Sequence, residues 1–133
     1  MARRYSITVD GIDHGGSPFP VASRIGLMVF SSTLSGRDPD TGELPADIEG
    51  QAVTAFKNIR RVVVAAGGSP DDIAKVVVFA RDRDAARAAI DRPWTELFPN
   101  PASRPVRHTV QAELPRGFHL QVEFVAVQED HIP

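Results

Sequence analysis

Residues 47–66, DIEGQAVTAFKNIRRVVVAA, decide most of the fold. Their apolar side chains recur every three or four residues and charged side chains fill the opposite side, which predicts an amphipathic helix of about five turns. Asp47 is a suitable N-cap, and Gly67 and Gly68 follow as a C-terminal stop. Because such a helix buries one face, the rest of the chain must supply a second layer.

The second layer is predicted to be a sheet, because the flanking segments have the residue types of strands. The run IAKVVVFA at residues 73–80 is typical of a strand that is covered on both sides. Upstream of the helix, aromatic and β-branched residues predict strands over 5–9, 21–24 and 27–32. The Asp, Pro and Gly residues of 38–43 predict a tight turn before the helix.

A second helix is predicted over residues 83–98, followed by a proline-rich loop at 99–105. Pro93 has no N–H to donate and clashes with the preceding turn. We therefore expect the helix to kink at Pro93 or to restart at Trp94.

Two strands, 106–113 and 118–127, close the chain, and LPRG at 114–117 predicts a hairpin between them. The predicted order is β-β-β-α-β-α-β-β, an α+β class in which two helices cover one face of the sheet. The other face is not clearly polar, since residues 28–30 and 76–79 are apolar. Another copy of the chain is the expected cover, so we predict a homo-oligomer.

Composition limits the class of protein. The 133 residues fit one domain over 1–133, and 15 basic against 17 acidic residues leave a net charge of −2. With 42% hydrophobic residues, the chain is typical of a globular protein. The absence of cysteine excludes disulfide scaffolds, thiolate zinc sites and cysteine nucleophiles. No apolar run approaches the ~20 residues of a membrane span and the start does not look like a secretory signal, so we expect a cytoplasmic protein.

Charge and histidine spacing argue against two kinds of site. The arginines are scattered and offset by acids, which does not favour a nucleic-acid partner. No histidine pair has metal-ligand spacing, so a metal site is not expected. The histidines are His14, His108, His119 and His131.

In the predicted hairpin, strand alternation places Arg107 on a face that can also carry Gln121 and Glu123. Two interpretations are open. The residues form polar pairs at the surface or between copies of the chain. Alternatively they form an anion site, since a guanidinium binds a carboxylate through two parallel hydrogen bonds.

An ordered series of segments resembles the RidA/YjgF family, also named L-PSP. The series consists of SPF at 17–19, the segments 31–45, 47–67, 72–82 and 114–127, and Arg107. The resemblance implies a fold similar to bacterial chorismate mutase, with a mixed sheet, assembled as a homotrimeric barrel with ligand clefts between subunits. It also implies hydrolysis of reactive enamines and imines to 2-keto acids and ammonia, without metal or cofactor.

The resemblance assigns roles to five residues, with departures from the family's usual pattern. Arg107 matches the arginine that grips the substrate carboxylate, although the stretch from it to the Leu-Pro pair is one residue shorter. Ser32 matches a serine that lines the cleft. Phe19 replaces a tyrosine, Asp91 an asparagine, and Gln121 the glutamate that activates water.

The last replacement matters most for catalysis. A glutamine amide can hold a water molecule but cannot take its proton near neutral pH. Glu123 and His119 lie one same-face step from Gln121 and are candidate substitutes, while Arg104 is an alternative to Arg107. Two functions therefore stay open: a Rid-type hydrolase in which Gln121 positions water, or a non-catalytic binder of small carboxylates. The family label also suggests an endoribonuclease, but the even charge and the lack of an aromatic cluster argue against it.

Overall fold

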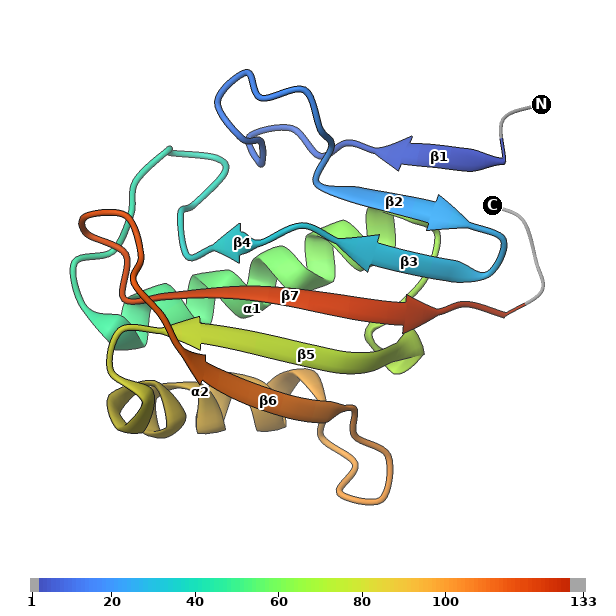
Figure 1. Ribbon diagram of the computed structural model, residues 1–133. Helices are drawn as coiled ribbons and strands as arrows, with labels where there is room; N and C mark the ends of the chain where they lie inside the picture. Colours follow the sequence, from blue (N-terminus) through green and yellow to red (C-terminus); the bar gives the residue numbers. More distant parts are fainter. Residues whose placement is uncertain (1–2, 130–133) are drawn as a thin grey trace.

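A seven-stranded mixed sheet forms the centre of the computed structural model, which describes residues 3–129 (Figure 1). Two helices, α1 (Ile48–Ala65) and α2 (Arg83–Leu97), pack on one face of the sheet, and a short 3-10 turn, η1 (Pro70–Asp72), precedes β5. The strands are β1 (Arg4–Ile7), β2 (Ala22–Ile25), β3 (Met28–Ser31), β4 (Leu34–Ser35), β5 (Ile73–Ala80), β6 (Val106–Gln111) and β7 (Leu120–Val127). The predicted α+β class and the two helices on one face are confirmed.

The strand order is β1-β2-β3-β7-β5-β6, and β4 pairs separately with β7. Every pairing is antiparallel except that of β5 with β6, which is parallel. The two-residue strand β4 was not predicted, because it is too short to show an alternating pattern. It matters for function, since it forms a wall of the candidate site.

The predicted hairpin between the last two strands is wrong. β5 lies between β6 and β7, so the two closing strands do not touch along their length. Helix α2 carries the chain from the end of β5 back to the start of β6, which is the crossover that a parallel pair requires. Residues 112–119 therefore pass across the end of β5 instead of turning tightly (Figure 1).

Helix α1 confirms the predicted helix, with its caps as expected. The Asp47 side chain accepts a hydrogen bond from the Gly50 N–H at 3.3 Å. At the other end Gly67 adopts φ +93°, which suits glycine, and its N–H bonds to the Val64 carbonyl at 2.9 Å. The apolar face of α1 is buried against the sheet.

Helix α2 runs without interruption from Arg83 to Leu97, so the predicted restart at Trp94 is wrong. Pro93 lies inside the helix and is buried. The Trp94 ring packs edge-on against Phe56 of α1 and Phe98, with ring centroids 6.3 and 4.7 Å away. These aromatic contacts favour the helical position of Trp94 and offset the hydrogen bond that the proline removes.

No helix of the described residues lies over the opposite face of the sheet, which we name the open face (Figure 1). Several large apolar side chains are exposed there: Met28 (41%), Phe30 (41%), Val106 (65%) and Val127 (47%). Soluble chains rarely expose so many adjacent apolar side chains without a partner surface. Within residues 3–129, no helix is both long and apolar enough to traverse a membrane.

Candidate functional site

Arg107 lies on β6 and its side chain packs on α2. The guanidinium carbon is 4.8 Å from the centroid of the Trp94 ring, and one terminal nitrogen is 3.5 Å from a carboxylate oxygen of Asp91. The side chain of Arg107 is 24% exposed and that of Asp91 is 72% exposed. A distance of 3.5 Å exceeds the about 2.7–2.9 Å of a strong charge-assisted hydrogen bond, so Asp91 holds this cation weakly.

The predicted shared face of Arg107, Gln121 and Glu123 is wrong. Arg107 pairs with Val76, whose side chain is fully buried beneath the helices, whereas Gln121 pairs with Phe79 on the open face. Successive side chains on a strand point to opposite faces, so the register of β5 sets these directions. Within one chain, the structure brings Arg107 to Asp91 and keeps it from Gln121.

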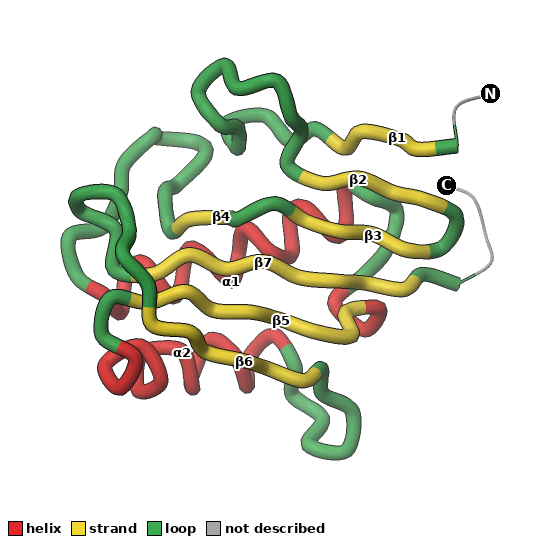
Figure 2. Tube along the Cα trace, viewed as in Figure 1, coloured by secondary structure: helices red, strands yellow, loops and turns green. Residues whose placement is uncertain are grey.

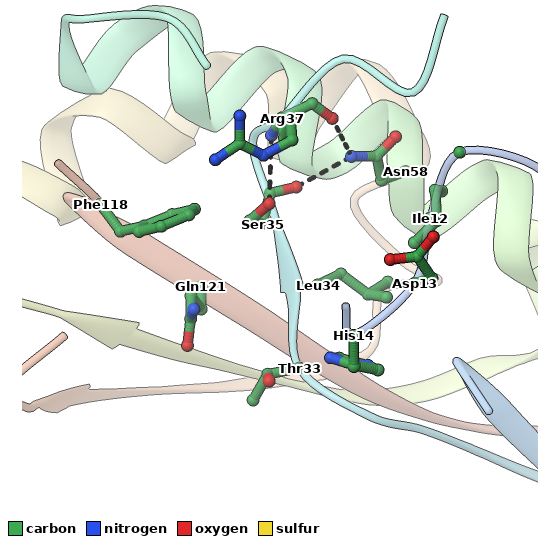
Figure 3. A pocket seen from close by; sticks show the side chains of 11 residues that line it. Ile12, Asp13, His14, Thr33, Leu34, Ser35, Arg37, Asn58, Phe118 and Gln121 are labelled. Atoms are coloured by element: carbon green, nitrogen blue, oxygen red, sulfur yellow. Dashed lines mark hydrogen bonds between the residues drawn. The ribbon is translucent and has the colours of Figure 1, made fainter. Parts of the chain in front are cut away.

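Gln121 is the one predicted site residue among the described residues that line a polar cavity of about 180 Å³ (Figure 3). The predicted Ser32 and Phe19 are not part of its lining. The residues that line the cavity come mainly from the loops β1–β2, β4–α1 and β6–β7 and from the strands beside them. Figure 2 shows these loops together at one end of the sheet. Its polar and charged lining includes His14, Thr33, Ser35, Arg37, Asn58 and Gln121. These groups offer donors, acceptors and a cation to a small polar ligand.

Gln121 reaches the cavity from the start of β7, where it pairs with Ser35 of β4. Its side chain is half-buried. An amide both donates and accepts hydrogen bonds, so Gln121 can orient a water molecule without exchanging protons with it.

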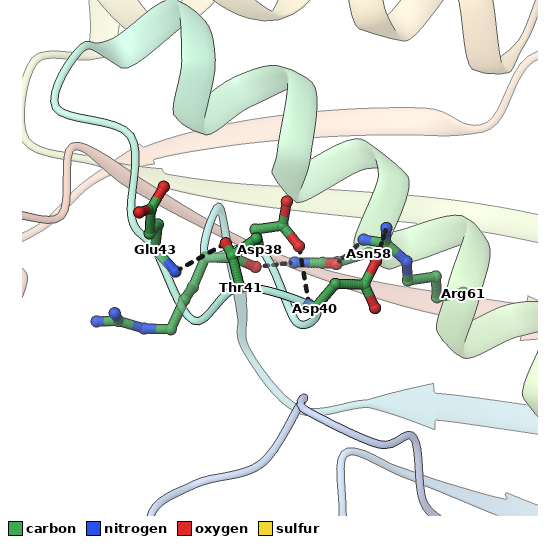
Figure 4. A network of polar contacts seen from close by, with 7 residues as sticks. Asp38, Asp40, Thr41, Glu43, Asn58 and Arg61 are labelled. Atoms are coloured by element: carbon green, nitrogen blue, oxygen red, sulfur yellow. Dashed lines mark hydrogen bonds and ion pairs between the residues drawn. The ribbon is translucent and has the colours of Figure 1, made fainter.

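The loop after β4 is held by a network centred on Asn58 of α1 (Figure 4). The buried Asn58 amide donates to the carbonyls of Ser35 at 2.8 Å and Arg37 at 2.9 Å, and it accepts from Arg61 at 2.7 Å. The predicted turn closes through the N–H of Gly42, which donates to the carbonyl of Asp38 at 2.8 Å. The network fixes the backbone that carries Ser35 and Arg37 into the cavity.

Arg37 is the one arginine among the described residues that line the cavity. One guanidinium nitrogen donates to the carbonyl of Gly42 at 2.8 Å. Its central carbon lies 5.6 Å from the centroid of the Phe118 ring. Arg37 is therefore a cation available to an anionic ligand in the same chain as Gln121.

The first loop touches the loop after β4 through Gly11, which lines the cavity. Gly11 adopts φ +80°, and a Cβ added there would come within 2.3 Å of the Pro39 carbonyl oxygen. Only glycine fits this position, because both the backbone conformation and the space exclude a side chain.

His14 connects the two other residues that the sequence had singled out here. Its Nε2 is 2.6 Å from the Ser32 Oγ, and its ring lies on Phe19 with centroids 4.4 Å apart. The Ser32 hydroxyl also donates to the carbonyl of Val21 at 3.1 Å. Phe19 itself is 50% exposed, so it forms a rim beside His14 and not a buried wall.

The two predicted substitutes for the family's glutamate lie outside this cavity. The N–H of His119 donates to the buried Gln51 side chain at 2.8 Å, and its Nε2 is 2.9 Å from the carbonyl of Ala46. These bonds hold His119 at the start of α1. Glu123 lines a separate shallow depression on the open face, next to Lys75.

The segment that carries Phe118 into the cavity is clamped by two side chains. Gln51 donates to the carbonyl of Gly117 at 2.8 Å, and Arg81 donates to the carbonyls of Phe118 at 2.7 Å and Pro115 at 2.7 Å. Side-chain hydrogen bonds therefore hold this segment in place. In a hairpin, backbone hydrogen bonds between the two strands would do so.

Sequence reasoning missed several of these residues, and only some left a signal. Gln51 and Asn58 lie on the apolar side of the helix pattern, and a polar residue there predicts a buried hydrogen-bonding role. Nothing local marks His14 or Arg37, because their partners are distant in sequence. Among residues 3–129, no group of three or more His, Asp or Glu side chains is arranged to hold a metal ion.

Comparison with known proteins shows to which family the chain belongs. The family model for Endoribonuclease L-PSP matches residues 16–128. TdcF of Escherichia coli K12 is 38% identical over 113 residues, covering 84% of this chain and 87% of its own. The 2-iminobutanoate/2-iminopropanoate deaminase of the same strain is 32% identical over 113 residues, covering 84% and 88%.

Solved structures agree as well. The crystal structure of E. coli TdcF with bound serine superposes with a TM-score of 0.83 at 33% identity, covering 94% of this chain and 99% of that one. The E. coli YjgF product gives a TM-score of 0.83 at 28% identity, with 94% and 99% covered. The family match, the relatives and the shared fold lead to one conclusion: the chain belongs to the L-PSP family, the group of RidA and YjgF proteins.

Proposed function

We propose that the protein hydrolyses small 2-imino and enamino acids to 2-keto acids and ammonia. The observation that carries this proposal is the polar cavity around Gln121. Its volume of about 180 Å³ suits a three- or four-carbon acid together with a water, which occupies about 30 Å³. A relative named as a deaminase of two such imino acids supports the same substrate class.

In the proposed assembly, a second copy of the chain completes the site. Arg107 and Asp91 lie at the β6 edge of the sheet, whereas the cavity lies beside β4 and β7. The apolar open face supports association, and we propose the homotrimer that the family resemblance implies. Arg107 of one protomer then grips the substrate carboxylate, while the cavity of the next holds the imine, with Phe19 and Ser32 along its rim.

The proposed reaction adds one water to the C=N bond. The water oxygen attacks the imine carbon, and the nitrogen gains protons until the C–N bond breaks and ammonia departs. The hydroxyl proton is lost as the C=O bond forms, so imine and water become keto acid and ammonia. Gln121 orients the attacking water, and the Arg107 guanidinium holds the substrate carboxylate. Holding both reactants in position lowers the entropic cost of bringing them together. The proposed reaction needs no cofactor. We also propose a cytoplasmic location, as the sequence predicts.

The test follows the loss of 2-iminobutanoate, generated in situ, in the presence of the purified protein. We expect loss faster than in buffer, with kcat/KM reduced at least tenfold in Arg107→Ala. A hydrogen bond to a charged group contributes about 1.5–3 kcal/mol, and about 1.4 kcal/mol corresponds to a factor of ten.

Arg92→Ala is the matched control, because Arg92 is an exposed arginine on α2 that pairs only with Glu96 among the described residues. Its activity should equal that of the wild type. Arg37→Ala distinguishes the roles of the two arginines. A large loss of kcat/KM in Arg37→Ala, with kcat/KM of Arg107→Ala unchanged, contradicts the role proposed for Arg107. A wild-type rate equal to that of buffer contradicts the hydrolase.

Gln121 favours a second candidate, a binder or sensor of small carboxylates that uses the same cleft. An amide in place of a carboxylate leaves that position without a proton acceptor near neutral pH. Saturable binding of 2-ketobutyrate by calorimetry, without turnover of the imine, would support this candidate over the first.

A further inference from the structure

His14 is an ionisable side chain in the cavity to which the family resemblance assigns no role. It comes from the loop between β1 and β2, and in Figure 3 it lies across Thr33 from Gln121. Imidazole is the side chain whose ordinary pKa lets it gain and lose a proton between about pH 5 and 8. The cavity therefore contains a proton-exchanging group although position 121 does not supply one.

The hydrogen bonds of Ser32 define which nitrogen of His14 carries the proton. A hydroxyl has one hydrogen, and Ser32 donates it to the Val21 carbonyl at 3.1 Å. The same carbonyl accepts the Ser32 N–H at 2.8 Å, and with the hydroxyl hydrogen directed to it as well, the Ser32 oxygen is left to accept from His14. The 2.6 Å contact with Ser32 is then a bond donated by the Nε2–H of His14.

The other ring nitrogen, Nδ1, is consequently an acceptor with a free lone pair. No described residue hydrogen-bonds to it. The Phe19 ring lies against the imidazole and limits its rotation. The charged groups that share the cavity with it are Asp13, whose carboxylate accepts from the Gly15 N–H at 2.9 Å, and Arg37.

We propose that His14 is the catalytic proton-transfer group of this protein and takes over the work that Gln121 cannot do. The inference rests on the proposed hydrolase function. Its Nδ1 accepts a proton from the attacking water as the C–O bond forms and passes it to the imine nitrogen. It then takes the hydroxyl proton as the C=O bond forms and passes that to the same nitrogen, so the C–N bond breaks and ammonia departs. The imidazole ends the cycle as it began, so imine and water again give keto acid and ammonia.

The test compares His14→Gln with the wild type in imine hydrolysis. A glutamine amide can still donate to Ser32 from nearly the Nε2 position, so the structural bond is kept while the proton acceptor is lost. We expect kcat to fall by about 10²-fold or more, since a positioned general acid–base group contributes about 10²–10⁴-fold. The pH dependence of kcat should change with it, because the variant has lost the proposed proton-exchanging group.

His119→Gln is the matched control, because His119 is anchored at the start of α1, outside the cavity. It should retain wild-type kcat and the wild-type pH profile. Equal losses in both variants, or a His14→Gln enzyme with an unchanged pH profile, would overturn the inference while the hydrolase function stands. A wild type without turnover instead defeats the proposed function itself, and the proton-transfer role with it.

A measurement that does not depend on turnover examines the same claim. The ¹⁵N chemical shifts of the His14 ring distinguish a protonated Nε2 from a protonated Nδ1 in the neutral imidazole. We expect the proton on Nε2. A proton on Nδ1 would contradict the inference whatever the activity.

Discussion

Arg107 has two neighbours that act on its charge in different ways. The Trp94 ring stabilises the cation by its face, while Asp91 competes with any anion that approaches from solvent. Because Asp91 is 72% exposed, its attraction is screened by water. The pair can therefore be opened at low cost, which a carboxylate-binding arginine requires.

This competition gives a prediction at the scale of one residue. Asp91→Asn removes the competing charge and keeps the shape, so 2-ketobutyrate should bind about two- to fivefold more tightly by calorimetry. The factor corresponds to the upper part of the about 0.2–1 kcal/mol of an exposed ion pair. Glu96→Gln, which removes a similar charge on α2, should leave the affinity unchanged; weaker binding by Asp91→Asn would contradict this role.

The sequence identified which residue types matter at this scale but not where they point. Arg107, Gln121 and Ser32 were selected by resemblance, and the directions of the side chains depend on which strand each neighbours. β6 and β7 each pair with β5 and not with each other, so the alternation within a hairpin could not show which face each side chain occupies. For this reason the predicted shared face of Arg107 and Gln121 was wrong.

At the scale of elements, Gln51 ties the start of α1 to the segment before β7. It is fully buried, donates to the carbonyls of Pro45 and Gly117 at 2.8 Å, and accepts from the N–H of His119 at 2.8 Å. The side-chain amide of Gln51 thus bonds through both its nitrogen and its oxygen to the two segments that flank the cavity.

Gln51→Leu should destabilise the protein by about 2–4 kcal/mol in urea denaturation. Leucine has nearly the same size, but it leaves buried carbonyls and an N–H without partners, at about 1–3 kcal/mol for each such group. Gln111→Leu is the control, because Gln111 is exposed, and it should change the unfolding free energy by less than about 0.5 kcal/mol. Equal stability of both variants would refute the clamp.

Periodicity predicted α1 and most strands because amphipathic repeats are local. It failed for the hairpin of β6 and β7, since no local pattern shows which strand lies between them. A different signal was present: a strand, helix α2 and another strand in succession favour a parallel crossover. That rule would have placed β6 beside β5 and moved Arg107 to the helix side.

At the scale of the whole molecule, the open face is the surface on which large apolar side chains stay exposed in a single chain. Phe30→Glu places a charge among the exposed apolar side chains of this face. We expect the wild type to sediment as an oligomer and the variant as a monomer, in sedimentation velocity at micromolar concentration. Burying an unpaired charge costs several kcal/mol, more than a modest interface supplies.

Val64→Glu is the control for this experiment. Val64 is 54% exposed, as apolar as Phe30, but it lies on α1 away from the open face. This variant should sediment like the wild type. A wild type that sediments as a monomer would contradict the predicted assembly.

The contact between Gly11 and Pro39 sets a limit on what the cavity can accept. The two backbones are so close here that no side chain at position 11 fits between the loops. If the proposed function holds, this contact keeps position 11 from contributing a side chain to the selection of acids in the cavity of about 180 Å³. Diversification toward bulkier metabolites would have to proceed through replaceable side chains such as Phe118, leaving position 11 unaltered.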